Sequence, residues 1–357
     1  MTSRNVAFRL WTFGSLSLAL IVASGCNQGS PSTTGTTITT PPPPAAAKTV
    51  YFVNAEPPQV TGGISITSIL AYSATTGGTA TPFVTINAPS NVVFDSVATD
   101  STGQLYVAAT TYSGSGSTAT STGYEILVYA AGVTSTATPV RTITSTAAFF
   151  PSTMVVDSTG NLYVGLRYSA GPPLGEVVEY SSTATGAAVP IRSIQSSGSP
   201  IWLPFQIALD SSNNLYMAGS VGSIGNYAPG ILVFSSTATG EAVASSQITE
   251  TDAFGVAIDS SGHIFTPIVN TTTSGVDIVE FAAGATGKPT PLKTFSGSGL
   301  SNLSYLTLDA AGNIFAVAQL APNIFIARFV VANQTVGPGN LIQLPSSTSG
   351  SGGVAVY

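Results

Sequence analysis

The stretch VATDSTGQLYV, residues 97–107, decides the fold because close variants of it return four more times along the chain. The variants are MVVDSTGNLYV at 154–164, IALDSSNNLYM at 207–217, VAIDSSGHIFT at 256–266 and LTLDAAGNIFA at 306–316. Each copy contains a short apolar run, a polar turn and a second run that carries an aromatic residue. Successive aspartates lie 57, 53, 49 and 50 residues apart, and a nearly constant period of this size indicates a repeated supersecondary unit.

Each repeat predicts a four-stranded β-sheet. In the repeat that begins with the stretch at 97–107, the runs 97–100, 104–109, 125–129 and 139–143 alternate apolar with polar residues. They are rich in β-branched and aromatic side chains, as strands are. The Asp of the motif predicts a tight turn between the first two strands, and the Gly that follows supplies the positive φ that such a turn needs. Asn213 takes the place of this Gly in the copy at 207–217, and Asn tolerates a positive φ better than most residues.

Aromatic residues recur at one position of the second strand and at one position of the third. The second-strand set is Tyr51, Tyr106, Tyr163, Tyr216, Phe265 and Phe315, and the third-strand set is Tyr72, Tyr129, Tyr180, Phe234, Phe281 and Phe329. Sheets that stack face to face need a bulky side chain at the same height in each sheet. We therefore expect these rings to pack between neighbouring sheets.

The two chain ends supply the parts of a sixth repeat. GGVAVY at 352–357 matches a first strand such as GVAID at 255–259, and KTVYFVNA at 48–55 matches a second strand. The sequence therefore predicts an all-β fold over residues 48–357, a six-bladed β-propeller of four-stranded blades. We expect the C-terminal strand to close the ring by pairing into the N-terminal blade, with Val354 to Val356 alongside Val50 to Val53.

The recurring Asp-Ser-x-Gly-Asn, Leu-Tyr-Val and Ile-x-Val-Tyr pattern resembles the NHL-repeat β-propellers of bacteria across residues 48–357. The resemblance implies the propeller fold. In the usual NHL repeat, Tyr-Val-Ala is followed by Asp and soon by Arg. Here the strands continue as YVAATT, YVGLRY, YMAGSV, FTPIVN and FAVAQL, so the polar positions of the family do not carry over.

Residues 1–25 predict a lipoprotein-type signal peptide. Arg4 and Arg9 precede an apolar run at 10–23 that is short for a transmembrane helix. The run Ala-Ser-Gly-Cys at 23–26 resembles a bacterial lipobox, although Ala23 stands where Leu is usual. The resemblance implies cleavage before Cys26, lipidation of Cys26 and export to the bacterial cell envelope, where the lipid contacts a membrane. An ordinary secretory signal or an uncleaved anchor is the alternative.

Residues 26–47 predict a lipid-anchored, low-complexity tether rich in Ser, Thr and Pro. The first part is flexible, and four successive prolines at 41–44 stiffen its end. Cys26 is the only cysteine, which excludes an intramolecular disulfide. The tether would hold the propeller away from the membrane.

The charge of the chain argues against nucleic acid as a partner. Charged residues make up only 7% of the sequence, and the formal net charge is −6. Phosphate binding needs clustered Lys and Arg, which this chain lacks. We expect a monomeric propeller that binds an unidentified protein or carbohydrate.

One rim of the propeller gathers the loops that join the fourth strand to the next first strand and the second strand to the third. Aromatic residues that we expect in these loops are Phe94, Phe149, Phe150, Trp202, Phe205, Phe254, Tyr112, Tyr168 and Tyr227. Phe149, Phe150, Trp202, Tyr168 and Tyr227 are our candidate ligand-binding residues for a carbohydrate or a peptide. The alternative is that these rings fill the spaces between blades.

Acidic residues gather on the same rim. Asp95, Glu250 and Asp252 fall in fourth-to-first loops, whereas Glu125, Glu176 and Asp277 begin third strands, with Arg167 as a positive neighbour. Glu125, Glu176, Glu250 and Asp252 are our candidate metal ligands for a hard cation such as Ca²⁺. A solvated anionic face is the alternative, and the predicted fold requires no cofactor.

The sequence favours non-catalytic binding or scaffolding over catalysis. His263 is the only histidine and stands in the turn at the opposite rim, where Asn161 and Asn313 stand in other repeats. With one imidazole and no cysteine inside the propeller, metal sites of several His or Cys ligands and Cys-His dyads are excluded. The alternative function is a metal-dependent hydrolase or lyase of the propeller lactonase type that uses carboxylates at the channel mouth.

Overall fold

The computed structural model describes residues 49–56, 66–114, 118–147, 149–168, 175–196, 201–223, 226–249, 254–272, 275–296, 300, 302–320, 323–330, 340–348 and 350–357. The predicted signal peptide, the tether and Cys26 lie outside these residues. The described part of the chain folds into strands, and none of it forms a helix with the length and hydrophobicity that a membrane crossing requires.

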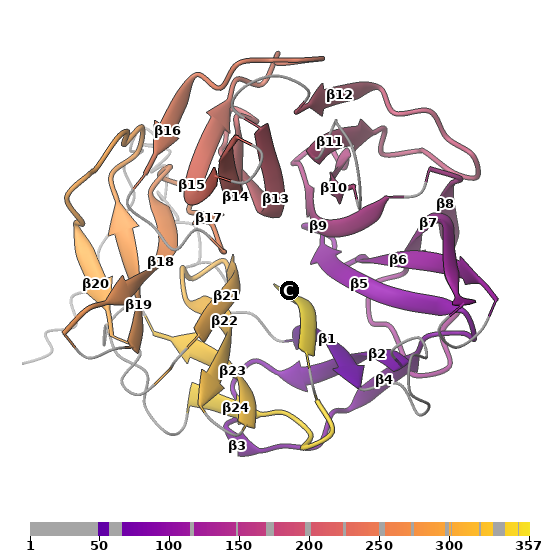
Figure 1. Cartoon of the computed structure of the whole chain (residues 1–357). Coiled ribbons are helices and arrows are strands. Elements are labelled where there is room, and N and C mark those ends of the chain that lie inside the picture. Colours follow the sequence, from indigo (N-terminus) through magenta and orange to yellow (C-terminus); the bar gives the residue numbers. More distant parts are fainter. Residues whose placement is uncertain are drawn as a thin grey trace, which may run out of the picture. The chain divides into compact units, whose positions relative to one another are not determined.

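Six sheets surround a central axis and form the blades of a β-propeller (Figure 1), which confirms the predicted fold. From the axis outward, blade 1 contains β25 (Gly350–Val356), β1 (Thr49–Glu56), β2 (Ile66–Ser73) and β4 (Val84–Asn87). Blade 2 contains β5 (Val92–Thr99), β6 (Leu105–Ser113), β7 (Thr120–Tyr129) and β8 (Arg141–Ser145), and blade 3 contains β9 (Phe150–Val156), β10 (Leu162–Arg167), β11 (Gly175–Tyr180) and β12 (Arg192–Gln195).

The remaining blades follow the same order. Blade 4 contains β13 (Ile201–Leu209), β14 (Leu215–Ser223), β15 (Asn226–Phe234) and β16 (Ser246–Ile248), and blade 5 contains β17 (Ala257–Ile258), β18 (Ile264–Asn270), β19 (Gly275–Phe281) and β20 (Lys293–Phe295). Blade 6 contains β21 (Asn302–Leu308), β22 (Ile314–Leu320), β23 (Asn323–Phe329) and β24 (Leu341–Gln343), to which β3 (Gly78–Thr79) adds in parallel. All other pairings between the named strands are antiparallel.

The C-terminal strand closes the ring as expected. β25 pairs antiparallel with β1, with Val356 opposite Val50 and Val354 opposite Phe52, and the C-terminus lies beside β1 in Figure 1. Thr49 and Tyr357 exchange two backbone hydrogen bonds of 3.0 Å just beyond this ladder. The first and last described segments therefore belong to one sheet, blade 1.

The repeated aspartates hold the turns between first and second strands. Asp100 Oδ1 accepts hydrogen bonds from the backbone N–H groups of Thr102 and Gln104, at 2.9 and 3.0 Å. The Asp residues of the other four motifs accept the same pair of bonds. Gly103 and Asn213 adopt φ values of 85° and 59°, so both residues take the positive φ that the sequence predicts.

The recurring aromatics are all buried and lie between blades, which confirms their predicted role. Each interface core joins the second-strand ring of one blade to the third-strand ring of the next. The six pairs are Tyr51 with Tyr129, Tyr106 with Tyr180, Tyr163 with Phe234, Tyr216 with Phe281, Phe265 with Phe329 and Phe315 with Tyr72. Because each sheet buries its faces against its neighbours, the hydrophobic core is a ring of six interfaces.

The outer edge of the ring carries inter-blade bonds that the sequence analysis did not predict. Two backbone hydrogen bonds link β8 to the next blade, since Thr144 N donates to Gly186 O and Gly186 N donates to Thr142 O, each at 2.7 Å. Gly240 and Gly287 make equivalent bridges to the blades before them, and β3 makes one to β24. Each of these outer strands is therefore fastened to the following blade.

The innermost strands begin earlier than expected because of β-bulges. β5 begins at Val92 rather than at 97, and its pairing with β6 skips Asp95, since Phe94 lies opposite Ala109 and Ser96 opposite Ala108. An extra residue shifts the in-and-out alternation, so the apolar pattern stops at the bulge. The same break occurs in β9, β13 and β21.

Several loop assignments were therefore wrong. Phe94, Asp95, Phe150, Trp202 and Phe205 lie inside innermost strands. Tyr112 and Tyr227, which we expected in second-to-third loops, lie in β6 and β15. The third strand of blade 2 likewise begins before its expected start, so Glu125 lies within β7 and not at its beginning.

We expect Phe281→Ala to lower the free energy of unfolding by about 3–5 kcal/mol, because it empties part of a closed interface core. The side chain of Phe281 is 1% exposed. Phe83→Ala is the matched control, since Phe83 is 59% exposed and its loss should change stability by less than about 0.5 kcal/mol. Denaturant unfolding of both variants measures the difference, and equal effects would contradict the role of the interface ring.

Candidate functional site at the channel mouth

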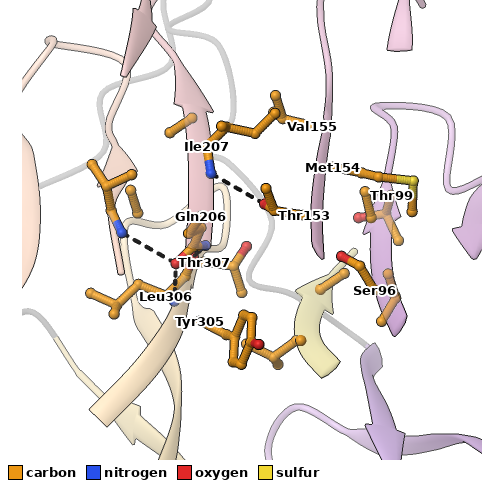
Figure 2. Close-up of a pocket in the computed structure, with 18 of the residues that line it drawn as sticks. Ser96, Thr99, Thr153, Met154, Val155, Gln206, Ile207, Tyr305, Leu306 and Thr307 are labelled. Carbon is orange, nitrogen blue, oxygen red and sulfur yellow. Dashed lines mark hydrogen bonds between the residues drawn. The ribbon is translucent and has the colours of Figure 1, made fainter. Parts of the chain in front are cut away.

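A cavity of about 190 Å³ follows the propeller axis and is lined by all six innermost strands (Figure 2). Toward the Asp turns its wall is mostly aliphatic, with Val156, Leu209, Ile258 and Leu308 beside Thr99. Toward the other rim the lining becomes polar, with Ser96, Thr153, Gln206 and Tyr305. The polar end faces the rim that the sequence analysis selected.

Side chains form hydrogen bonds with backbone groups along the inner edges of the blades. Gln206 Oε1 accepts hydrogen bonds from Leu306 N at 2.9 Å and Val256 N at 3.2 Å, and so links blades 4, 5 and 6. Thr153 Oγ1 accepts one from Ile207 N at 3.1 Å (Figure 2). Ser152 Oγ donates to Pro204 O at 2.9 Å. These bonds fix the innermost strands and leave fewer free edge groups for an added strand.

Tyr305 lines the polar end of this cavity, and four residues from four other blades are linked to it through charges and ring contacts. We call these five residues the channel mouth. They are Asp95 of blade 2, Arg167 of blade 3, Phe205 of blade 4, Phe254 before β17 of blade 5, and Tyr305 of blade 6. The guanidinium carbon of Arg167 lies 4.9 Å from the centre of the Phe205 ring, within cation–π range. Phe254 meets Phe205 edge to face, with ring centroids 5.2 Å apart and planes at 82°.

Asp95 is the bulged residue of β5 and an unusual carboxylate. Thr110 Oγ1 donates a hydrogen bond of 2.6 Å to its Oδ2. Burial in the channel wall raises the pKa of Asp95 from its ordinary value of 3.8 to about 7, although the Thr110 bonds and the charge of Arg167 act in the opposite direction. Asp95 is nevertheless partly exposed, and the positive charge of Arg167 acts on its carboxyl group.

Tyr305 lies on the bulge of β21 and lines the cavity (Figure 2). Its φ of 52° is rare for a residue other than glycine, and such backbone strain persists only where the surroundings hold it. Burial and the charge of Asp95 raise the pKa of its phenol, whereas Arg167 lowers it. The charges of Asp95 and Arg167 therefore both act on the Tyr305 phenol.

Tyr305 was missed by sequence reasoning, although a signal for it exists. Asp95, Phe205 and Phe254 stand five residues before the turn Asp of their repeats, and Tyr305 stands four before Asp309. Counting back five residues from each turn finds the first three and leads to Ser304, the neighbour of Tyr305, in the last repeat. Periodicity could not find them, because the bulge interrupts it.

The structure disperses our candidate ligand-binding residues. Phe149 and Tyr168 pack together with ring centroids 3.8 Å apart, whereas Trp202 is 2% exposed and packs with Phe234 in the core between blades 3 and 4. Phe150 is partly buried at the start of β9, and Tyr227 is partly exposed in β15. Their role in binding stays a prediction.

Our candidate metal ligands also occupy different surroundings. Glu176 is buried and accepts hydrogen bonds from Tyr168 Oη at 2.7 Å, Ser193 Oγ at 2.6 Å and Gln195 Nε2 at 3.2 Å. Glu125 is partly buried in β7, and Glu250 and Asp252 lie outside the described residues. Among the residues that the structure describes, no three His, Cys, Asp or Glu side chains gather in a metal-binding arrangement. The metal site and the lactonase-type alternative stay predictions.

His263 is a turn residue, as expected. Its Nδ1 lies 3.0 Å from Asp259 Oδ2 and 3.4 Å from Glu280 Oε1, and Lys293 Nζ lies 2.7 Å from the other oxygen of Glu280. These contacts occupy His263 at the rim opposite the channel mouth.

Comparison with known proteins shows likeness of fold alone. No family model and no curated protein matches the chain. Among solved structures, the chain is similar to a protein of unknown function from Bacteroides caccae, at 9% identity and a TM-score of 0.49, over 87% of this chain and 99% of that one. A protein from Lactobacillus plantarum gives 14% identity and a TM-score of 0.45 over the same shares. Hydrazine synthase from Kuenenia stuttgartiensis gives 13% and 0.42, over 75% of this chain and 74% of that one.

We expect Asp95→Asn to change how stability depends on pH. Between about pH 4 and pH 7 the unfolded chain has released the proton of Asp95 while the folded protein still holds it, so the Asp95 contribution to stability falls as pH rises through this window. Melting temperatures of the wild type and the variant, measured from pH 4 to pH 8, test this. The advantage of the variant should grow with pH, and parallel profiles would contradict the shifted pKa.

Proposed function

We propose that this chain is an exported, lipid-anchored, non-catalytic binding propeller whose ligand occupies the channel mouth. The observation that carries the proposal is the convergence of one cation, one carboxyl group and three aromatic rings from five blades at one end of the axial cavity. Such a concave site with apolar walls and a few polar groups is where small ligands commonly bind.

Because the backbone around the mouth is rigid, we favour ligand binding at the mouth over scaffolding through flexible loops. Asp95, Phe205 and Tyr305 stand on bulges of innermost strands, and the bonds of Gln206 hold three of these strands together. A ligand therefore meets side chains on a fixed backbone and orders little of the protein when it binds. The carboxyl group of Asp95 is buried in the channel wall and already accepts a hydrogen bond of 2.6 Å from Thr110 Oγ1, which supports binding over chemistry.

The repeated turns and interface aromatics support a bacterial NHL-repeat-like lipoprotein as the wider class of this chain. Localisation at the cell envelope is supported by the lipobox-like Cys26 and by the tether of residues 26–47, which precede the first blade. A tether of this length spans roughly 25 to 65 Å, depending on its extension. It would let the channel mouth reach ligands beyond the membrane surface.

Cys26→Ser should move the protein from the membrane fraction to the soluble fraction, because the proposed lipid is its attachment. Fractionation of cells that express the full chain, followed by immunoblotting, measures the shift. Ser24→Ala is the control, since it leaves the thiol in place and should keep the protein with the membrane. Membrane retention of the Cys26 variant would refute lipid anchoring.

Phe254→Ala should weaken ligand binding at the mouth, because Phe254 is 43% exposed and forms its aromatic wall. The test titrates the full-length protein in detergent with neutral and acidic cell-wall oligosaccharides by calorimetry. Loss of one ring contact of ~1 kcal/mol corresponds to about fivefold weaker binding. Phe83→Ala, at the outer edge, should bind as the wild type does.

Two outcomes would overturn the proposal. Equal binding by the Phe254 and Phe83 variants would place the ligand elsewhere. Cleavage of any oligosaccharide after incubation with the protein, detected by mass spectrometry, would make the protein an enzyme.

A further inference from the structure

The guanidinium group of Arg167 is available to a ligand. It lies against the Phe205 ring, and within the described residues it donates no hydrogen bond. Arg167 is partly exposed at the end of β10, and its charge acts on the carboxyl group of Asp95. A guanidinium group offers five N–H donors in a planar fork that matches a carboxylate, and a neighbouring aromatic ring fixes its plane.

The apolar part of the site lies next to this fork. Phe254 and Phe205 present two rings at nearly a right angle, and the larger exposed fraction belongs to Phe254. Such rings cover the C–H face of a sugar ring, whose hydroxyl groups project sideways toward polar neighbours. Tyr305 supplies a hydroxyl group on the Asp95 side of the mouth, whereas Thr110 is buried and its hydroxyl group is taken up by Asp95.

An extended peptide fits this end of the channel less well. Peptides that add a strand to a sheet need unpaired backbone groups on its edge. Here Thr153 and Gln206 take up the backbone N–H groups of Ile207, Val256 and Leu306 on the inner edges. Recognition must therefore come from the aromatic rings and the charges rather than from strand addition.

We propose that the channel mouth binds a carboxylate-bearing sugar, whose carboxylate pairs with Arg167 and whose ring packs on Phe254 and Phe205. This inference rests on the proposed function, because it names the ligand class of the same site. No bond is made or broken in this step, so the sugar leaves as it entered.

Asp95 makes this binding depend on pH. The charged or titratable groups that act on it are Arg167, Tyr112 and Tyr305, and burial raises the pKa of both phenols, so they stay neutral near pH 7. Above about pH 7 an ionised Asp95 neutralises Arg167 and repels the ligand carboxylate, whereas below it the mouth carries the charge of Arg167 alone. If only the protonated form binds, affinity rises by up to about tenfold from pH 8 to pH 6.

The test compares trigalacturonate with the neutral galactose trimer of the same linkage. Calorimetry on the full-length protein in detergent, at pH 6 and pH 8, should show binding of the acidic trimer, tighter at pH 6, and at least about tenfold weaker binding of the neutral trimer. Arg167→Gln should remove this preference. Lys288→Gln removes one exposed positive charge outside the mouth and should leave the preference unchanged.

The outcomes separate this inference from the proposed function. If both trimers bind equally and Phe254→Ala weakens both while Arg167→Gln changes neither, the mouth binds ligands but not through a carboxylate, and the inference is wrong. If trialanine binds more tightly than trigalacturonate, the ligand is a peptide terminus, and the inference is also wrong. If no panel member binds, both proposals fail. Melting temperatures of each variant check that lost binding does not reflect lost folding.

Discussion

The structure depends on the fact that a single blade cannot bury both of its faces alone. Each sheet places an aromatic ring toward one neighbour from its second strand and toward the other from its third, as Tyr216 and Phe281 do between blades 4 and 5. Removing any blade would expose two such interfaces, so the ring must be complete. The pairing of β25 with β1 satisfies this requirement, because it makes the chain ends part of one blade.

The same regularity builds the site. Every repeat brings its innermost strand to the channel at the same height, and bulges in β5, β13 and β21 turn Asp95, Phe205 and Tyr305 toward the mouth. The residues that hold the fold are alike in each blade, whereas the residues at this height differ in charge and size. At these positions the backbone structure repeats but the side chains differ. The fold therefore does not require a particular side chain there, which leaves these side chains free to contact a ligand.

The sequence predicted what recurs and missed what crosses between blades. Asp100 and its equivalents could be read as turn residues, since their function needs only neighbours within four positions. The contact of Arg167 with Phe205 joins two blades, and no spacing rule reveals it. Asp95 and Arg167 were noted on the correct rim, but the bulge hid the strand position of Asp95, and Tyr305 was missed. The bridge of Gly186 to Ile143 escaped for the same reason.

Because the chain has few charged residues, the charge at the mouth matters for binding. With charged residues at 7% and a net charge of −6, most of the surface offers neutral hydroxyl and amide groups, and the overall field repels anions. The guanidinium group of Arg167 at the mouth reverses that sign locally, and partial burial shields its charge from salt better than full exposure would. Because Asp95 is the carboxyl group whose charge opposes it there, one proton decides whether the mouth is positive or neutral. Selectivity then follows from local pairing at Arg167, while the rest of the ring discourages anions from binding elsewhere.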